Sequence, residues 1–206
     1  MTDSPTPIVN HHADHAGFGG VFGLVAALGM LVMGRGYARL AVDLASVSHG
    51  DRVVDIGCGP GNAARAAARR GARVVGIDPA PVMLRLARAA TRDRPTVSWS
   101  QGTAEALPVS DGWATVVWAL KTVHHWKEVT AGIAELRRVL APSGRLLVVE
   151  RRVQPGATGL ASHGWTERQA ESFAAQCRAA GLVGLRVSRH QDGRGAVWVV
   201  HGDQPG

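Results

Sequence analysis

The chain has 206 residues, of which 46% are hydrophobic, and it carries a formal net charge of +7. This length fits a single domain with a substantial core, and the hydrophobic content excludes wholesale disorder. The basic charge is weak support for nucleic-acid binding, because no run of five basic residues occurs. Five arginines are spaced instead as solvent faces of helices: Arg65, Arg69, Arg85, Arg88 and Arg92.

The first fifteen residues are polar and contain His11, His12 and His15 with no cysteine beside them. Such a segment is typical of a solvated terminus, and we expect these histidines to bind no metal. Cys58 and Cys177 also lack the spacing of metal ligands. We interpret them as reduced thiols of a cytoplasmic protein.

Residues 16–34 contain no charged side chain and reach the lower limit of length for a membrane-spanning helix. Their glycines lower both hydrophobicity and helix propensity, and no basic stretch precedes them as in a secretory signal. Three interpretations stay open, in this order: a lid or dimer helix, a membrane-surface anchor, and a true span. A helix at 37–46 follows. We therefore divide the chain into an N-terminal tail with apolar lid or dimer helices (1–50) and a second domain (51–206).

Residues 53–61 read Val-Val-Asp-Ile-Gly-Cys-Gly-Pro-Gly and precede an alanine-rich stretch at 63–70. This pattern predicts a buried strand, a tight turn and a helix N-terminus, whose amide hydrogens face a ligand. A dinucleotide fingerprint would need glycine in place of Asn62, whereas Asp55 to Gly61 reads Asp-x-Gly-x-Gly-x-Gly. A second strand at 73–77 ends at Asp78, a carboxylate that can accept hydrogen bonds from both hydroxyls of a ribose.

With Asp78 in place, the chain resembles the class I S-adenosylmethionine-dependent methyltransferases, and most closely the branch called methyltransferase type 11 or UbiE-like. The resemblance covers about residues 51–150. It implies an α/β fold with a Rossmann-like, mostly parallel sheet of seven strands flanked by helices, the last strand antiparallel. It also implies S-adenosyl-L-methionine as the cofactor and S-adenosyl-L-homocysteine as the product.

The same resemblance implies where the cofactor is held. The glycine turn would approach its methionine moiety, Asp55 its α-amino group and Asp78 its ribose. A stretch at 102–108 would contact the adenine, but Thr103 stands where the family has aspartate, and Ala114 is a further departure. The expected cofactor contacts are Asp55, Gly57, Cys58, Gly59, Gly61, Asp78, Pro79, Met83, Thr103, Ala104, Glu105 and Ala119.

A fourth strand at 114–120 is followed by Lys121 and then by the pair His124-His125. Ligands of doubly wound sheets sit beyond the C-terminal ends of strands, so both histidines can stand near cofactor and substrate. We name His124 and His125 as candidate catalytic bases, with Glu150 and His163 behind them; ordinary packing is the alternative. Adjacent side chains point in different directions, so at most one should reach the acceptor. Lys121 would attract an acidic group of substrate or cofactor.

The rest of the chain completes the pattern. It predicts a helix at 128–140, a strand at 145–150, a short connection at 151–164, a helix ending at 180, and closing strands at 184–190 and 196–201. Thr166 and Gly181 are placed to cap that last helix.

We therefore expect a methyltransferase that acts by in-line transfer on a small, apolar or aromatic molecule. The apolar segment 16–34 and four tryptophans favour such an acceptor: Trp113, Trp118, Trp126 and Trp165. An RNA methyltransferase stays open as an alternative, as does a cofactor-binding protein without transfer activity, because Thr103 and Ala114 depart from the family pattern. DNA is not expected as a partner. A homodimer through the N-terminal helix and weak membrane association also stay open.

Overall fold

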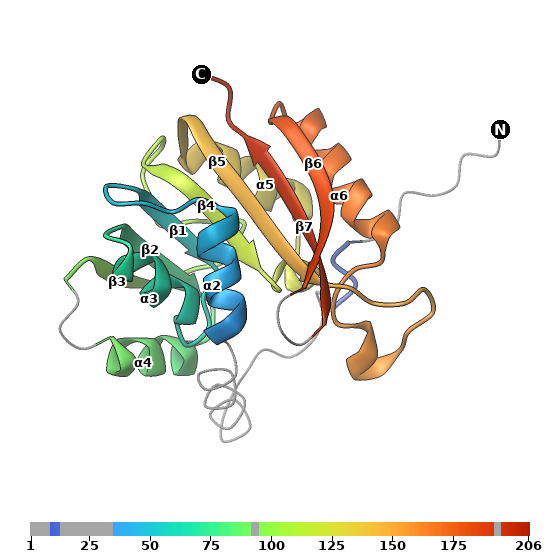
Figure 1. Cartoon of the computed structure of the whole chain (residues 1–206), viewed down its shortest axis with the longest axis horizontal. Helices are drawn as coiled ribbons and strands as arrows, with labels where there is room; N and C mark the ends of the chain where they lie inside the picture. The colour runs from blue at the N-terminus through green and yellow to red at the C-terminus, as the bar shows by residue number, and fades with distance from the viewer. Residues whose placement is uncertain (1–8, 13–34, 92–94, 192–194) are drawn as a thin grey trace.

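The computed structural model describes residues 9–12, 35–91, 95–191 and 195–206, and these ranges contain a seven-stranded sheet with helices on both faces (Figure 1). The elements are α2 (Arg35–Leu44), β1 (Arg52–Ile56), α3 (Asn62–Arg69), β2 (Arg73–Asp78), α4 (Pro81–Ala90), β3 (Val97–Gln101), β4 (Ala114–Leu120), η1 (Val123–His125), α5 (Val129–Val139), β5 (Leu140–Arg151), η2 (Gly159–Ser162), α6 (Glu167–Ala179), β6 (Val183–Gln191) and β7 (Ala196–Asp203). Their order across the sheet is β3-β2-β1-β4-β5-β7-β6.

The direction of the strands confirms the fold predicted from the sequence. Strands β1 to β5 pair in parallel, whereas β7 pairs antiparallel with both β5 and β6. The order in which strands are added changes direction at β1: β2 and β3 lie on one side of β1, and β4 lies on the other. In open α/β sheets ligands bind at this switch point, outside the carboxyl ends of the strands.

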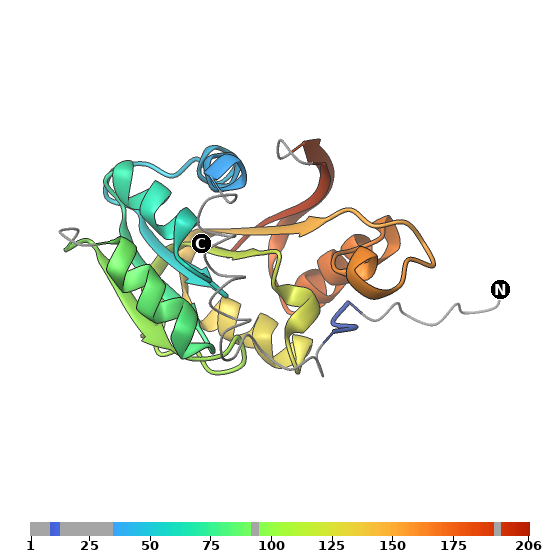
Figure 2. The same cartoon turned by 90° about the horizontal axis from the view of Figure 1, so that it is seen from below.

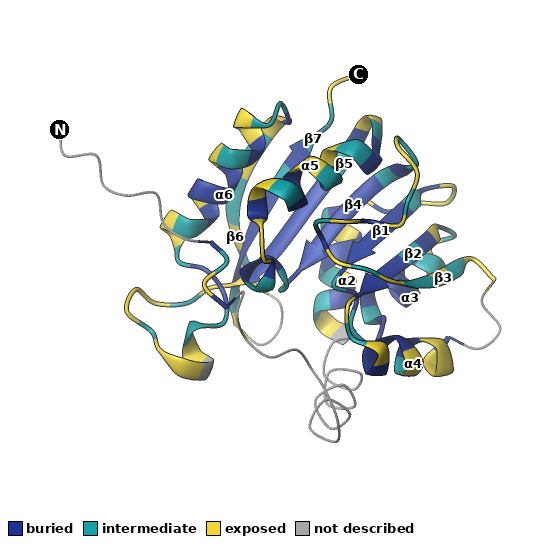
Figure 3. Ribbon diagram, turned by 180° about the vertical axis from the view of Figure 1, so that it is seen from behind, coloured by how far each residue is buried: buried dark blue, intermediate teal, exposed yellow. Residues whose placement is uncertain are grey.

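Alternate side chains of each central strand feed two separate cores. Val53 packs with residues of α2 and α3, while its neighbour Val54 packs with residues of α5 and α6. Both are fully buried, as expected of a parallel strand covered on both faces. Figure 2 shows α2 on one side of the sheet and α5 and α6 on the other, and Figure 3 shows that the buried surface follows the central strands.

Local signals in the sequence place several element ends correctly. Thr166 caps α6 in a reciprocal capping box with Gln169, and Gly181 follows the helix with a left-handed φ of 95°. Strand β5 begins five residues earlier than expected, because Leu140 already pairs with Ala114 before a shift in register. The residues predicted as a turn therefore interrupt the start of a long strand.

Within the described ranges, no helix combines the length and the apolar character that crossing a bilayer requires. Residues 16–34 lie outside those ranges. The lid, dimer and membrane interpretations of that segment therefore stay predictions.

Candidate active site

Asp78 ties the glycine turn to the end of β2. Its Oδ2 accepts a hydrogen bond of 2.8 Å from the backbone N–H of Gly59, and its Oδ1 accepts one of 2.9 Å from Ala80. Burial raises the pKa of Asp78, although these two N–H donors act in the opposite direction. The carboxylate predicted to hold a ribose therefore also sets the position of the turn in front of it.

The three glycines of the turn are required for different reasons. All have positive φ, from 52° at Gly59 to 78° at Gly61. A Cβ on Gly57 would collide with Thr122 of the β4–α5 loop, and one on Gly61 would collide with the ring of Trp99. A Cβ on Gly59 would meet no atom of the described residues within 4 Å. Of these three glycines, Gly59 is thus the one that leaves room, within the described part of the chain, for a ligand to approach the backbone.

One arginine beside the turn is not where the sequence placed it. Arg65 was expected on a solvent face of α3, but it is buried. Its guanidinium donates 2.6 Å hydrogen bonds to the carbonyl oxygen of Pro60 and to Oδ1 of Asn62. The guanidinium of Arg65 therefore stabilises the glycine turn, because a buried charged group needs hydrogen-bond partners.

Asp55 meets the requirement of a cofactor with an ammonium group. The residue is buried, and burial followed by the nearby charge of Asp78 raises its pKa to about 7. Its Oδ2 has no hydrogen-bond partner within the described part of the chain. A buried carboxylate oxygen without a partner is costly, so an external donor would be favourable here. The residues present therefore fit the amino-acid end of S-adenosylmethionine.

Several other expected contacts are occupied by the protein itself. Glu105 accepts hydrogen bonds from the backbone N–H groups of Lys127 (2.8 Å) and Glu128 (3.2 Å), and so anchors the start of α5. Met83 and Ala119 are 1% and 0% exposed. In this conformation their side chains serve packing and present no surface to a ligand.

The remaining predicted contacts surround the end of the sheet. Cys58 is nearly buried, and burial raises the pKa of its thiol well above the ordinary value, so it stays protonated. Pro79 and Thr103 are exposed, whereas Ala104 is buried. Each of these residues lies in a loop that follows a strand, as the sequence predicted.

His124 forms a buried pair with Glu150. The Nδ1 atom of His124 lies 2.8 Å from Oε2 of Glu150, and Oε1 of the same carboxylate accepts a 2.8 Å hydrogen bond from the N–H of Val123. Glu150 is 0% and His124 is 3% exposed. Both carboxylate oxygens are thus used to fix η1 at the end of β4.

His125 is less buried and has a different environment. Burial, and next the neighbouring His124, lower its pKa to about 4, so its ring is neutral at neutral pH. The ring centroids of His124 and His125 lie 4.1 Å apart. His163, from the β5–α6 connection, lies 5.7 Å from each of these rings.

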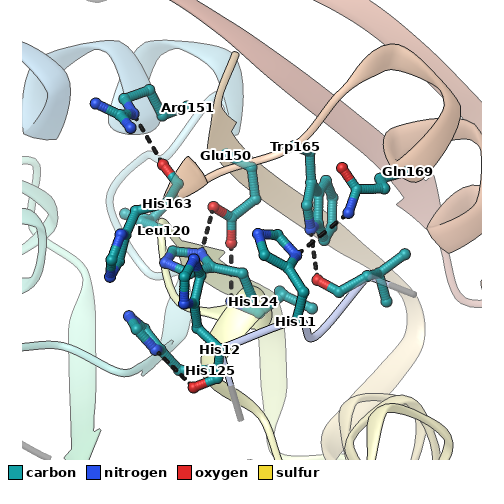
Figure 4. Close-up of polar contacts among 12 residues, drawn as sticks. His11, His12, Leu120, His124, His125, Glu150, Arg151, His163, Trp165 and Gln169 are labelled. Carbon is teal, nitrogen blue, oxygen red and sulfur yellow. Dashed lines mark hydrogen bonds and ion pairs between the residues drawn. The ribbon is translucent and has the colours of Figure 1, made fainter. Parts of the chain in front are cut away.

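Residues 9–12 join this cluster, which corrects the expectation of a solvated terminus (Figure 4). His12 is buried and its ring stacks on His163, with centroids 3.9 Å apart and an interplanar angle of 14°. His11 lies 4.6 Å from His12. Five histidines therefore meet here, but no group of three metal-binding side chains within the described residues is arranged to hold a metal ion.

Three of the four tryptophans that suggested an apolar or aromatic acceptor pack inside the protein. Trp118, Trp126 and Trp165 are buried in the two cores. Lys121, which was expected to attract an acidic group, has its Nζ 4.3 Å from the centre of the ring of Tyr37, in a cation–π contact. Tyr37 in turn donates a hydrogen bond to the carbonyl oxygen of Leu120. Together these two contacts hold α2 against the end of β4.

Comparison with known proteins agrees with this geometry. Residues 54–148 match the family model of a methyltransferase domain. A demethylmenaquinone methyltransferase of Thermus thermophilus is 39% identical over 128 residues, which cover 60% of this chain and 58% of the relative. The chain spans about half the length of the curated relatives it matches.

Solved structures share the fold at low sequence identity. A methyltransferase in complex with the Haloferax volcanii Trm112 activator has a TM-score of 0.77 at 22% identity, covering 88% of this chain and 95% of the other. The [4+2]-cyclase SpnF has a TM-score of 0.68 at 18% identity, covering 97% and 88%.

The parallel sheet, its switch point and the turn held by Asp78 define a class I methyltransferase fold. Together with the family match, this confirms the resemblance predicted from the sequence: residues 54–148 match the methyltransferase domain, and demethylmenaquinone methyltransferases, which are UbiE-like, are among the relatives. S-adenosylmethionine is the cofactor of that family.

Proposed function

We propose that this protein transfers a methyl group from S-adenosylmethionine to a small, apolar or aromatic molecule. The observation that carries the proposal is the close approach of Thr122 to Gly57, where a Cβ would collide with the Thr122 side chain, so that the glycine turn lies beside the loop that bears the histidine pair. Cofactor turn and candidate base thus meet at one end of the sheet. The demethylmenaquinone methyltransferases among the relatives are consistent with an aromatic acceptor.

The chain's own residues would bind and orient the cofactor. Asp55 offers its unpartnered oxygen to the α-ammonium group, Gly59 lets the backbone approach the methionine moiety, and Asp78 accepts from the ribose hydroxyls. The N–H of Ala104 would face the adenine, with Thr103 beside it in place of the usual aspartate. When bound, S-adenosylmethionine supplies an electrophilic methyl group on its sulfonium sulfur.

We assign the role of base to His125. Its ring is neutral at neutral pH and is less buried than that of His124, so its Nε2 can accept the proton of an acceptor hydroxyl. His124 is held by Glu150 and serves to position the loop. Alignment of acceptor and methyl group contributes further, and orientation alone is worth on the order of 7–11 kcal/mol.

One experiment tests the proposal as a whole. Cell extract is incubated with the protein and isotope-labelled S-adenosylmethionine, and the lipid, small-metabolite and RNA fractions are analysed for label by mass spectrometry. We expect label in a small apolar or aromatic molecule, in the cytoplasmic fraction. Asp78→Ala protein is the control and, at a low concentration of labelled S-adenosylmethionine, should label that molecule much more weakly. Label in RNA alone would contradict the proposal.

A second candidate deserves the same assay. The cyclase SpnF shares the fold over most of this chain. The second candidate is therefore a protein that binds the cofactor without transferring its methyl group. Such a protein would bind S-adenosylmethionine in calorimetry and yet label no fraction of the extract.

A further inference from the structure

The segment 9–12 is held by three separate parts of the chain. The side-chain amide of Asn10 donates 3.1 Å hydrogen bonds to the carbonyl oxygens of Trp126 and Lys127. The indole N–H of Trp165 donates a 2.8 Å hydrogen bond to the carbonyl oxygen of Val9, whose side chain is 2% exposed. These contacts join the loop after β4 to the start of α6.

Two further contacts fix the segment to the β5–α6 connection. The Nε2 atom of His11 lies 2.8 Å from the carbonyl oxygen of Ser162, and the Nε2 atom of His12 lies 3.0 Å from its hydroxyl. The segment therefore connects three parts of the chain. We call residues 9–12 the strap.

The backbone of His12 reaches both histidines of the pair. Its N–H donates a 2.9 Å hydrogen bond to the carbonyl oxygen of His124. Its carbonyl oxygen lies 3.4 Å from Nδ1 of His125 (Figure 4). A distance of 3.4 Å is long for a hydrogen bond, but catalytic hydrogen bonds commonly shorten only when substrate binds.

This arrangement determines the tautomer of His125. A carbonyl oxygen can only accept, so the hydrogen must be on Nδ1, and Nε2 keeps its lone pair. Glu150 favours the same tautomer of His124, because its Oε2 accepts from Nδ1. Backbone and carboxylate thus hold the two adjacent rings from different sides.

We propose that His12 is a positioning residue of the active site: through its main-chain carbonyl group the strap holds His125 with Nε2 ready to receive the proton of the methyl acceptor. The inference rests on the proposed role of His125 as base. It adds that the base is completed only by a segment more than 100 residues away in sequence.

The tautomer is measured directly by ¹⁵N nuclear magnetic resonance of the imidazole rings, which needs no acceptor and no methyl transfer. Two point variants loosen the strap: Asn10→Ala removes two donors, and Trp165→Phe removes one donor while keeping an aromatic ring. Deletion of residues 1–12 removes the strap entirely. His190→Ala, on β6 and outside the cluster, assigns signals and serves as control.

We expect wild-type His125 to be in the Nδ1–H form. In the combined Asn10→Ala, Trp165→Phe variant and in the deletion, the ring should shift toward the Nε2–H form that solvated imidazole prefers. Affinity for S-adenosylhomocysteine should stay within about twofold, which shows that the fold is intact. Should the deletion fail to fold, the point variants decide.

Turnover provides the second measurement once an acceptor is known. Misplacement of a base by about 1 Å costs on the order of 100-fold, so the strap variants should lose kcat with little change in the KM of S-adenosylmethionine. An unchanged His125 tautomer in all strap variants would overturn the inference. Failure of the labelling assay with a changed tautomer would instead overturn only the proposed function.

Discussion

At the scale of single residues, the candidate site is built on carboxylates that each hold two partners. Asp78 holds the glycine turn and Ala80, and we propose that its further lone pairs accept from a ribose, while Glu150 holds both Val123 and His124. The sequence indicated both acids, because each ends a strand. It did not indicate their second partners, which come from backbone N–H groups that only the folded loops bring near.

Replacement of Asp78 tests the cofactor site. Charged hydrogen bonds are worth about 1.5–3 kcal/mol, so Asp78→Ala should weaken binding of S-adenosylhomocysteine at least tenfold. Asp78→Asn keeps the volume and one acceptor oxygen but removes the charge and the second acceptor, so its dissociation constant should lie between those of the wild type and Asp78→Ala. Calorimetry measures all three proteins, and equal dissociation constants would show that the ribose is held elsewhere.

The two adjacent histidines should respond differently to alanine. His125→Ala should lose about 10²–10⁴ in turnover with cofactor affinity unchanged, because a base is lost. His124→Ala leaves the fully buried Glu150 without its ring partner, which should cost about 1–3 kcal/mol of stability. Steady-state kinetics and thermal denaturation separate the two effects. Full activity of His125→Ala between pH 6 and 9 would leave positioning alone as the mechanism.

At the scale of elements, the glycine turn is where sequence and structure agree most closely. Strand, turn and helix are encoded within residues 52–69, and local patterns of this kind need no knowledge of the rest of the fold. The reason for each glycine, in contrast, depends on Thr122 and Trp99, which belong to other elements. The resemblance to the family assigned all three glycines to the cofactor.

A matched pair of substitutions distinguishes these roles. Gly61→Ala should destabilise the protein, because its Cβ would enter the ring of Trp99 at a φ of 78°. Gly59→Ala carries a comparable backbone strain, but its Cβ meets no atom of the described residues and would point to the space proposed for the cofactor, so it should additionally weaken cofactor binding. Denaturation and calorimetry of both variants test this, and identical profiles would contradict the assignment of open space to Gly59.

The strap marks where prediction from the sequence ended. A polar stretch with two histidines is indistinguishable from a solvated tail, because its partners Ser162 and Trp165 lie about 150 residues away. The tryptophans say little about the acceptor for a related reason. A tryptophan in a strand or helix can pack in a hydrophobic core as readily as it can line a pocket, and here three of the four pack in the cores.

At the scale of the whole molecule, Asp55 and His125 give stability opposite dependences on pH. The pKa of Asp55 is raised to about 7 in the fold from 3.8, so its contribution is full below pH 3.8 and is lost as pH rises through 7. The pKa of His125 is lowered to about 4 from 6.5, so its contribution is lost as pH falls from 6.5 to 4.

Asp55→Asn should therefore change the pH profile of the cofactor-free protein. The variant removes the carboxylate that must ionise in a buried site, so relative to wild type it should gain stability at pH 8 compared with pH 5. Thermal denaturation across this range measures the difference. His125→Ala should flatten the acidic side only. Parallel profiles for wild type and Asp55→Asn would mean that Asp55 ionises as readily in the fold as in the unfolded chain.

The distance along the chain between the strap and its partners also has a consequence for biosynthesis. Val9 is made 156 residues before Trp165, its hydrogen-bond partner. At about 5–20 residues per second, the ribosome needs on the order of 10–30 s to supply that partner, whereas the β1–α3–β2 unit can form as soon as it emerges. Such long-range contacts form late in folding. A nascent chain can therefore form its glycine turn well before the strap is held against Trp165.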